Sequence, residues 1–251
     1  YLMQKVKSME KKLLRVLSNE GIGCYFTMKL ATDENLDIKP GQFLNLQIKE
    51  KSLRRPISIS DYKDGVITLA IKINGEGTKI LSEMPVGEEI DTLLPLGNGI
   101  DLDLFKDEIL LVGGGIGVAP LLYIAREAKN KGLKVTTVLG FGNRDNTILL
   151  EEIKAYSDNF FVSYDCDGLN VVDVLKREGL ETIKYFACGP LVMLKGVASY
   201  CKEGYCSLEA RMGCGFGACM GCSATFKSGR KRVCKEGPVF EAEDIIWENL
   251  M

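Results

Sequence analysis

From Glu108 to Ala125 the chain reads Glu-Ile-Leu-Leu-Val-Gly-Gly-Gly-Ile-Gly-Val-Ala-Pro-Leu-Leu-Tyr-Ile-Ala. An apolar run, a glycine-rich turn and an apolar helical pattern follow one another, which predicts a strand, a tight loop and a helix. The loop glycines permit close approach to a pyrophosphate, and Pro120 suits the first turn of a helix whose amide groups face phosphate. Because the loop lacks the G-x-G-x-x-G pattern, a purely structural turn remains an alternative.

Three later segments read as strands separated by helical patterns: Leu133–Gly142, Asn159–Tyr164 and Ile183–Pro190. This alternation predicts a parallel sheet, whose ligands lie beyond the carboxyl ends of the strands. The glycine loop and Cys188-Gly189-Pro190 both occupy such ends. A lone cysteine is also commonly a buried thiol, so both interpretations of Cys188 stay open.

The first hundred residues differ, because short alternating segments are broken by turn pairs such as Asp64-Gly65 and Asn74-Gly75. This pattern predicts an antiparallel barrel with little helix. The predicted fold class is therefore α/β plus all-β. An N-terminal antiparallel β-barrel is expected over residues 1–102, a central parallel α/β nucleotide-binding domain over 103–205, and a small C-terminal cysteine module over 206–251.

Within the barrel region, the run Arg54-Arg-Pro-Ile-Ser-Ile-Ser60 places guanidinium and hydroxyl groups beside a proline-stiffened strand. The fork of an arginine suits the paired oxygens of a diphosphate. Taken alone, the same run also fits an edge strand with exposed basic residues.

Four of the nine cysteines, Cys214, Cys219, Cys222 and Cys234, form the pattern C-x4-C-x2-C-x11-C. This is the plant-type ferredoxin spacing for a 2Fe-2S cluster. Interspersed glycines allow the backbone to wrap closely around a cluster and turn amide groups toward sulfur. A four-cysteine zinc site normally uses two C-x2-C pairs, and this chain has one. Zinc and ordinary free thiols remain alternatives, and a disulfide framework is disfavoured by the absence of a visible export signal.

Composition excludes several functions. The chain has no histidine, which rules out Ser-His or Cys-His nucleophile pairs and a histidine general base. A net charge of -2 creates no overall field for nucleic acid or an anionic membrane. No apolar run approaches the roughly 20 residues needed to span a bilayer. We therefore expect a cytoplasmic protein with no nucleic-acid or membrane partner.

Several motifs occur together and in order: Arg55–Ser58, Gly75–Thr78, Pro95–Gly99, Gly113–Pro120, Cys188–Pro190 and the cysteine loop. In this combination the chain resembles the electron-transfer subunit of class B dihydroorotate dehydrogenase, a member of the ferredoxin-NADP reductase superfamily with an added C-terminal iron-sulfur module. The resemblance runs from about Lys39 to Val239, nearly the whole chain.

The resemblance implies three sets of binding residues and no catalytic residue. It implies that FAD is bound by Arg55, Pro56, Ile57, Ser58, Ile71, Lys72, Ile73, Gly77 and Thr78. It implies that NAD is bound by Gly113, Gly114, Gly115, Ile116, Gly117, Val118, Ala119, Pro120, Cys188, Gly189 and Pro190. It implies that the 2Fe-2S cluster is bound by Cys214, Cys219, Cys222 and Cys234. Relatives often carry an aromatic residue and Arg where this chain has Ile71 and Lys72, so a phosphate contact survives here but a ring stack does not.

The resemblance also implies a pathway and a partner. An FMN-containing catalytic subunit would oxidise dihydroorotate in pyrimidine biosynthesis, in a heterotetramer with two of each subunit, and electrons would run from FMN through the cluster and FAD to NAD. A flavin converts between the electron pair of a nicotinamide and the single electrons of a cluster. We expect Ser207–Phe240 to form part of the contact surface, although Met212, Phe216 and Met220 also suit packing around the cluster.

Other interpretations remain open. The chain also fits a flavin and iron-sulfur subunit of another NAD(P)H-ferredoxin or sulfide-type oxidoreductase, an adaptor that no longer binds nicotinamide, or, in a different class, a zinc-stabilised nucleotide-binding regulator without redox activity. NADP is the less favoured nucleotide: Arg144 either meets a 2'-phosphate or is a solvated loop residue paired with Asp145.

Overall fold

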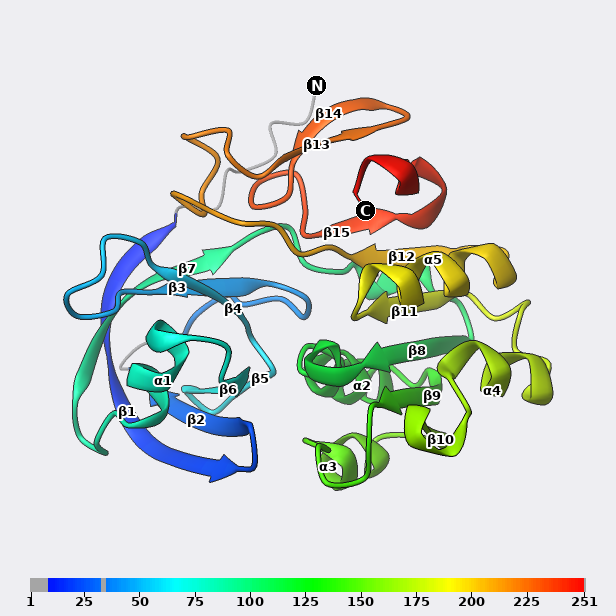
Figure 1. Ribbon diagram of the computed structural model, residues 1–251, viewed down its shortest axis with the longest axis horizontal. Helices are drawn as coiled ribbons and strands as arrows, with labels where there is room; N and C mark the ends of the chain where they lie inside the picture. Colours follow the sequence, from blue (N-terminus) through cyan, green and yellow to red (C-terminus); the bar gives the residue numbers. More distant parts are fainter. Residues whose placement is uncertain (1–8, 33–34, 251) are drawn as a thin grey trace.

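The computed structural model describes residues 9–32 and 35–250 and has two sheets and a small hairpin (Figure 1). The N-terminal sheet lies to the left in that view, the second sheet with its helices lies to the right, and the cysteine segment and hairpin lie above them. This arrangement confirms the predicted fold class.

The N-terminal sheet has seven antiparallel strands in the order β4-β3-β7-β1-β2-β6-β5. Their bounds are β1 Glu10–Ile22, β2 Tyr25–Ala31, β3 Phe43–Leu46, β4 Arg55–Ser58, β5 Asp61–Lys63, β6 Val66–Lys72 and β7 Glu89–Leu96. The edge strands β4 and β5 are separated in the chain only by Ile59 and Ser60, so the sheet must curl to bring its edges together. The Ser60 amide donates to the Thr68 carbonyl at 2.9 Å across this closure. The short helix α1, Glu76–Ser82, follows β6.

The second sheet has six strands in the order β10-β9-β8-β11-β12-β15. Their bounds are β8 Glu108–Gly114, β9 Lys134–Phe141, β10 Asn159–Tyr164, β11 Tyr185–Cys188, β12 Gly204–Ser207 and β15 Val239–Glu241. The first five in that order run parallel, and β15 is antiparallel to β12. The strand order reverses direction between β8 and β11, which is where open parallel sheets form a ligand crevice.

Four helices cover this sheet: α2 Leu121–Asn130, α3 Leu150–Lys154, α4 Val171–Glu178 and α5 Leu191–Tyr200. Alternate residues of β8 enter two different cores. Ile109 and Leu111 pack with α2, whereas Leu110 and Val112 pack with α4 and α5. Burial on both faces explains why this strand is a continuous apolar run. Short 3-10 turns complete the chain at Leu102–Leu104, Gly115–Val118, Asp165–Asp167, Ala242–Asp244 and Trp247–Asn249.

The C-terminal module contains a hairpin of β13, Ser223–Phe226, and β14, Gly229–Arg232. Strand β12 crosses the expected boundary between residues 205 and 206, and β15 returns from the module to the edge of the second sheet. No helix in the described part of the chain has the length and apolar character that a membrane crossing requires.

Helix α2 joins the two domains. The Tyr123 side chain is buried in the barrel core, and its hydroxyl donates to the Ile38 carbonyl at 2.9 Å. One turn later, Arg126 donates to the Asp61 carboxylate from Nη2 at 2.8 Å and to the Tyr62 carbonyl at 2.7 Å. The helix that begins at the glycine loop is therefore fixed against the barrel.

Candidate functional site

A central cleft with about 1000 Å³ of empty space lies where the barrel, the glycine loop and the cysteine module meet. Six of the residues predicted to bind FAD line it: Pro56, Ile57, Ser58, Ile71, Lys72 and Thr78. Five of those predicted to bind NAD also line it: Ile116, Gly117, Ala119, Pro120 and Cys188. Two predicted groups, separated in sequence by the stretch between Thr78 and Ile116, therefore share one cleft.

The other three residues predicted to bind FAD do not line this cleft. Arg55 lies over the start of α1, where a Cβ at Gly77 would come within 2.5 Å of the guanidinium Nε. The glycine leaves room for that arginine, which donates hydrogen bonds to the Leu53 and Arg54 carbonyls. Ile73 instead packs against the barrel core.

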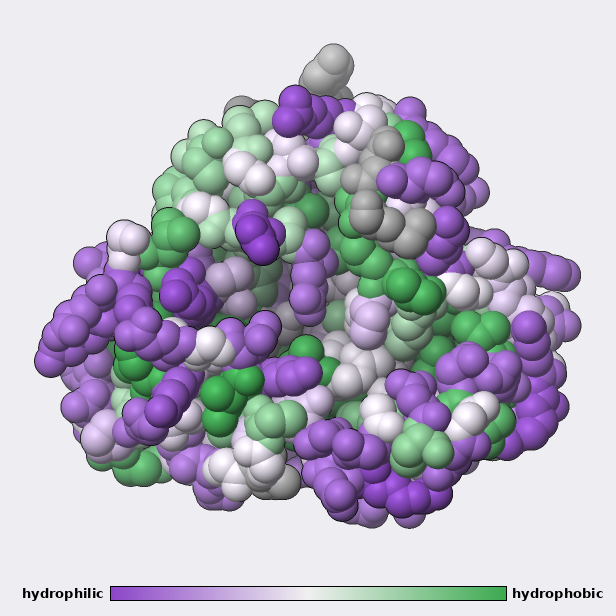
Figure 2. Space-filling view, in the orientation of Figure 1, coloured by the Kyte–Doolittle hydropathy of each residue, from purple (hydrophilic) through white to green (hydrophobic). Residues whose placement is uncertain are grey.

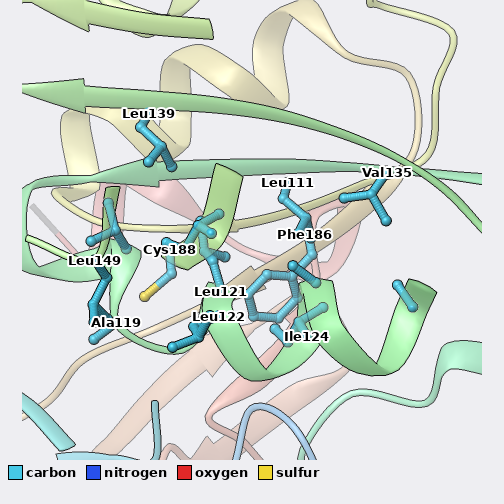
Figure 3. Close-up of a cluster of buried hydrophobic side chains, with 14 of the residues drawn as sticks. Leu111, Ala119, Leu121, Leu122, Ile124, Val135, Leu139, Leu149, Phe186 and Cys188 are labelled. Atoms are coloured by element: carbon cyan, nitrogen blue, oxygen red, sulfur yellow. The ribbon is translucent and has the colours of Figure 1, made fainter. Parts of the chain in front are cut away.

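The glycine loop and Cys188 meet at the carboxyl ends of β8 and β11. Cys188 pairs in register with Gly113, and Figure 3 shows its side chain among Ala119, Leu121 and Leu149. Burial raises the pKa of the Cys188 thiol to about 12, so the thiol is neutral near pH 7. The residue therefore offers a neutral thiol at the cleft wall and not a reactive thiolate.

A second pocket, of about 1150 Å³, lies on the other side of the glycine loop. Gly114, Gly115 and Pro190 of the predicted NAD set line it, together with Gly142 after β9 and Asp165 after β10. The remaining three, Gly113, Val118 and Gly189, line neither cavity. A Cβ at Gly113 would lie 2.6 Å from the Leu121 Cδ1, and one at Gly189 would lie 2.7 Å from the Met193 Cε, so both glycines allow close packing.

Arg144 forms an ion pair two residues beyond Gly142, which lines this second pocket. Its Nη2 donates to the Asp167 carboxylate at 2.5 Å, and its guanidinium lies 4.3 Å from the Tyr164 ring centroid. The ion-pair partner is therefore Asp167, in the turn after β10, and not the adjacent Asp145.

The cysteine loop directs backbone amides at sulfur. The amides of Ala218 and Cys219 donate to the Cys214 Sγ at 3.2 and 3.4 Å, and the Cys234 amide donates to the Cys222 Sγ at 3.4 Å. Burial alone would raise the pKa of Cys214, but these amide hydrogen bonds lower it below the ordinary thiol value.

The donor set fits a thiolate-ligated cluster: three thiols lie in one loop with amide donors to sulfur, and Cys234, after the β13–β14 hairpin, contacts Cys222 through its amide. A Cβ at Gly213 would lie 3.2 Å from the Cys219 Sγ, so the glycine leaves space beside that sulfur. Within the described residues, no three thiol or acidic side chains form a group that could hold a single metal ion.

Comparison with known proteins agrees with this geometry. The family described as the oxidoreductase FAD-binding domain matches residues 17–99. The family described as the iron-sulfur cluster binding domain of dihydroorotate dehydrogenase B matches residues 209–246. The dihydroorotate dehydrogenase B (NAD(+)) electron transfer subunit of Fusobacterium nucleatum is 42% identical over 224 residues, which cover 82% of this chain and 86% of that protein. This chain belongs to the dihydroorotate dehydrogenase B electron transfer subunits.

Another member of the family, the electron transfer subunit of Streptococcus thermophilus, is 40% identical over 238 residues, covering 88% of this chain and 92% of that protein. Among solved structures, that of an NADH-dependent reduced ferredoxin-NADP oxidoreductase superposes with a TM-score of 0.85 at 30% identity, covering 95% of this chain and 92% of that one. A ferredoxin-NADP+ reductase of Plasmodium falciparum, at 15% identity and a TM-score of 0.63 over 79% of this chain and 92% of that one, shares the fold.

Sequence reasoning missed several cleft residues of this electron transfer subunit. Ser207, Leu208 and Glu209 line the cleft because they lie at and just after the carboxyl end of β12, where ligands of parallel sheets bind. The Glu209 side chain is exposed at the cleft, yet the surrounding walls partly desolvate its carboxyl and raise its pKa. Phe43 lines the cleft because β3 pairs with β4, and no local sequence pattern predicts that pairing.

Proposed function

We propose that this chain links an FMN-containing subunit that oxidises dihydroorotate to NAD+, with FAD and a 2Fe-2S cluster as its bound carriers. The single observation that carries the proposal is the central cleft, which is lined together by β4, the glycine loop with Cys188, and the segment leading into the four cysteines. A carrier of this kind needs a flavin between a nicotinamide and a cluster. The cleft is bordered by residues predicted to bind NAD and by the segment that leads into the four cysteines.

In this proposal the barrel binds FAD. Arg55, which lies over Gly77 and donates to the Leu53 carbonyl, would contact the diphosphate, and Lys72 would add a second positive charge. Pro56, Ile57 and Ser58 present an extended strand edge to the cleft. FAD, when bound, exchanges an electron pair with a nicotinamide and single electrons with an iron-sulfur cluster.

The nucleotide would straddle the glycine loop. Its nicotinamide end would enter the central cleft beside Cys188, whose neutral thiol keeps negative charge away from the ring. Its adenosine end would occupy the second pocket. NAD is favoured over NADP, because Asp167 already neutralises the nearby Arg144.

The catalytic subunit would dock on the cysteine module. Phe216 and Met220 flank two of the cluster cysteines and expose 41% and 50% of their surface. Figure 2 shows weakly polar and apolar residues gathered at the upper left of that view, where Figure 1 places the cysteine segment. We propose a heterotetramer with two copies of each subunit. A cytoplasmic location suits nine free thiols, because such compartments keep thiols reduced.

The test is co-expression with an FMN-containing, dihydroorotate-oxidising subunit and purification without oxygen. A stable complex that reduces NAD+ only when dihydroorotate is added supports the proposal. The purified chain alone should lose its flavin absorbance on addition of NADH. Failure of both NADH and NADPH to reduce that flavin would favour an adaptor, and a colourless zinc protein would overturn the proposal.

A further inference from the structure

We propose that Asn45 and Asn98, two asparagines of the barrel, are positioning residues that fix the four-cysteine segment at a set separation from the flavin site. Neither residue is a cluster ligand. The inference rests on the proposed function and adds the means by which the barrel holds the cluster in place.

Asn45 reaches the first cluster cysteine. Its side chain lies in β3 with 1% of its surface exposed, and its Nδ2 donates to the Cys214 carbonyl at 3.1 Å, across 169 positions of sequence. Its Oδ1 is buried and has no hydrogen-bond partner. An unsatisfied buried acceptor is unfavourable, so an apolar residue of similar size would suit this buried position better. The asparagine therefore serves the bond to Cys214 and not the barrel alone.

The cysteine loop packs directly against the side-chain amide of Asn45. Gly215 has a φ of +80°, and a Cβ there would lie 2.3 Å from the Asn45 Nδ2. Glycine at this position is thus required twice, by its backbone conformation and by the close approach. Any side chain at 215 would push the loop away from β3.

The same asparagine belongs to the flavin side of the barrel. In the pairing of β3 with β4, Asn45 lies opposite Pro56, one of the residues predicted to bind FAD. Its backbone carbonyl accepts from the Arg54 Nη1 at 3.3 Å, and Phe43, two residues earlier, lines the central cleft. One residue therefore contacts both the strand pair of the flavin site and the backbone of a predicted cluster ligand.

Asn98 holds the other end of the segment, just after Cys234. Its Nδ2 donates to the Glu236 carbonyl at 3.0 Å and to the Val239 carbonyl at 3.1 Å, and its backbone amide donates to the Gly237 carbonyl at 2.8 Å. The neighbouring Gly97 allows this contact, because a Cβ there would lie 2.5 Å from the Pro238 Cδ. The barrel thus forms hydrogen bonds with the four-cysteine segment near its first and its last cysteine.

Groups that hold ligand residues from outside the coordination sphere typically change metal affinity by about 10–100-fold when removed. We therefore expect Asn45→Leu, which keeps the shape of the side chain and removes its donor, to release iron to a chelator about tenfold faster than the unmodified holoprotein. NADH should still reduce the bound flavin at the normal rate, whereas the following transfer of an electron to the cluster should slow.

Asn19→Leu is the matched control. The Asn19 Nδ2 also donates to backbone carbonyls of the barrel, those of Leu81 at 2.8 Å and Met84 at 3.0 Å, and its buried Oδ1 also lacks a partner. Both of these hydrogen bonds stay within the barrel. A general loss of barrel stability would appear in both variants, but faster iron release and slower transfer to the cluster should appear only with Asn45→Leu.

The experiment uses the anaerobic holoprotein and compares chelator-induced loss of cluster absorbance, flavin content and stopped-flow reduction at flavin and cluster wavelengths. Gly215→Ala and Asn98→Ala disturb the same contacts from the loop side and the far end, and they carry the test if Asn45→Leu does not fold. Equal behaviour of these variants and Asn19→Leu would overturn the inference. Failure of the proposed function is distinguishable, because the unmodified protein would then contain no iron or would show no flavin reduction by NADH.

Discussion

The Cys188 carbonyl at the end of β11 lies so close to Gly117 of the glycine loop that a Cβ at 117 would come within 2.3 Å of its oxygen. Cys188 is also in register with Gly113 at the end of β8. The glycine loop therefore packs against the carboxyl end of β11, and the two together form one wall of the central cleft. Adding one methyl group at this contact should therefore weaken nucleotide binding.

We expect Gly117→Ala to weaken nucleotide use strongly. The added Cβ meets backbone atoms, which cannot move away as a flexible side chain would, so loop and strand must separate. Overpacking of this kind destabilises by about 1–3 kcal/mol, and a displacement near 1 Å in a binding site reduces rates on the order of 100-fold. Stopped-flow reduction of the bound flavin by NADH measures the loss.

Gly21→Ala is the control for this experiment. Gly21 lies in β1, and a Cβ there would meet only the Tyr25 carbonyl oxygen, at 4.0 Å. This variant should reduce its flavin as the unmodified protein does. If Gly117→Ala matched it, the loop would have no role in nucleotide binding.

The cluster assignment predicts a sharp difference between cysteines. Cys219→Ser should lose most of its iron and visible cluster absorbance, because the pattern leaves no spare thiol in the loop. Cys166→Ser, which changes an exposed cysteine outside the loop, should keep both. Iron analysis and the paramagnetic signal after reduction check the result, and zinc in place of iron in the unmodified protein would contradict it.

Local sequence patterns predict most of the fold. The predicted strand Asn159–Tyr164 coincides with β10, and the glycine-rich turn begins at Gly115 directly after β8, which includes Gly113 and Gly114. In both cases the sequence signal and the structure lie within a few residues of each other. The long-range features were out of reach. The edge strand β15 depends on a return from the cysteine module, and the bond from Asn45 to Cys214 joins residues 169 positions apart.

The binding residues show the same limit. The spacing of the four cysteines and the order of the motifs predict the cofactors. They do not predict the second pocket, which is formed by the ends of β9 and β10 with the starts of α4 and α5. Similarly, Arg144 pairs with Asp167 and not with its neighbour Asp145, because the turn after β10 brings the distant carboxylate closer.

The interface between barrel and helix α2 should contribute measurably to stability. Asp61 accepts from Arg126 at 2.8 Å, and the two side chains expose only 19% and 12% of their surface. Asp61→Asn should lower the free energy of unfolding by about 2 kcal/mol, the typical contribution of a hydrogen bond between charged groups. The midpoint of urea unfolding of the holoprotein measures this. Glu83→Gln, which removes the exposed pair with Lys79 at 3.9 Å, should shift the midpoint little.

Acid should remove a smaller contribution at Asp158. Hydrogen bonds from the Lys129 ammonium and the Val135 amide lower the pKa of this carboxyl. Its charged form is thus favoured in the folded state, so the stabilisation is present above the ordinary pKa and is lost as the pH falls through the lowered one. With 37% of the side chain exposed, the gain is under about 1 kcal/mol. Asp158→Asn should lower the Tm at pH 7, and the difference should vanish in acid; a difference that persisted would contradict this account.

The preference for NAD should depend on the carboxylate of Asp167. Because this residue pairs with Arg144 at 2.5 Å beside the second pocket, Asp167→Asn should free the guanidinium for a 2'-phosphate. A hydrogen bond to a charged group contributes about 1.5–3 kcal/mol, so the KM for NADPH should fall roughly tenfold or more while that for NADH changes little. Adding Arg144→Ala to this variant should abolish the gain. An unchanged ratio of kcat/KM for NADPH and NADH in Asp167→Asn would show that the nucleotide is selected elsewhere.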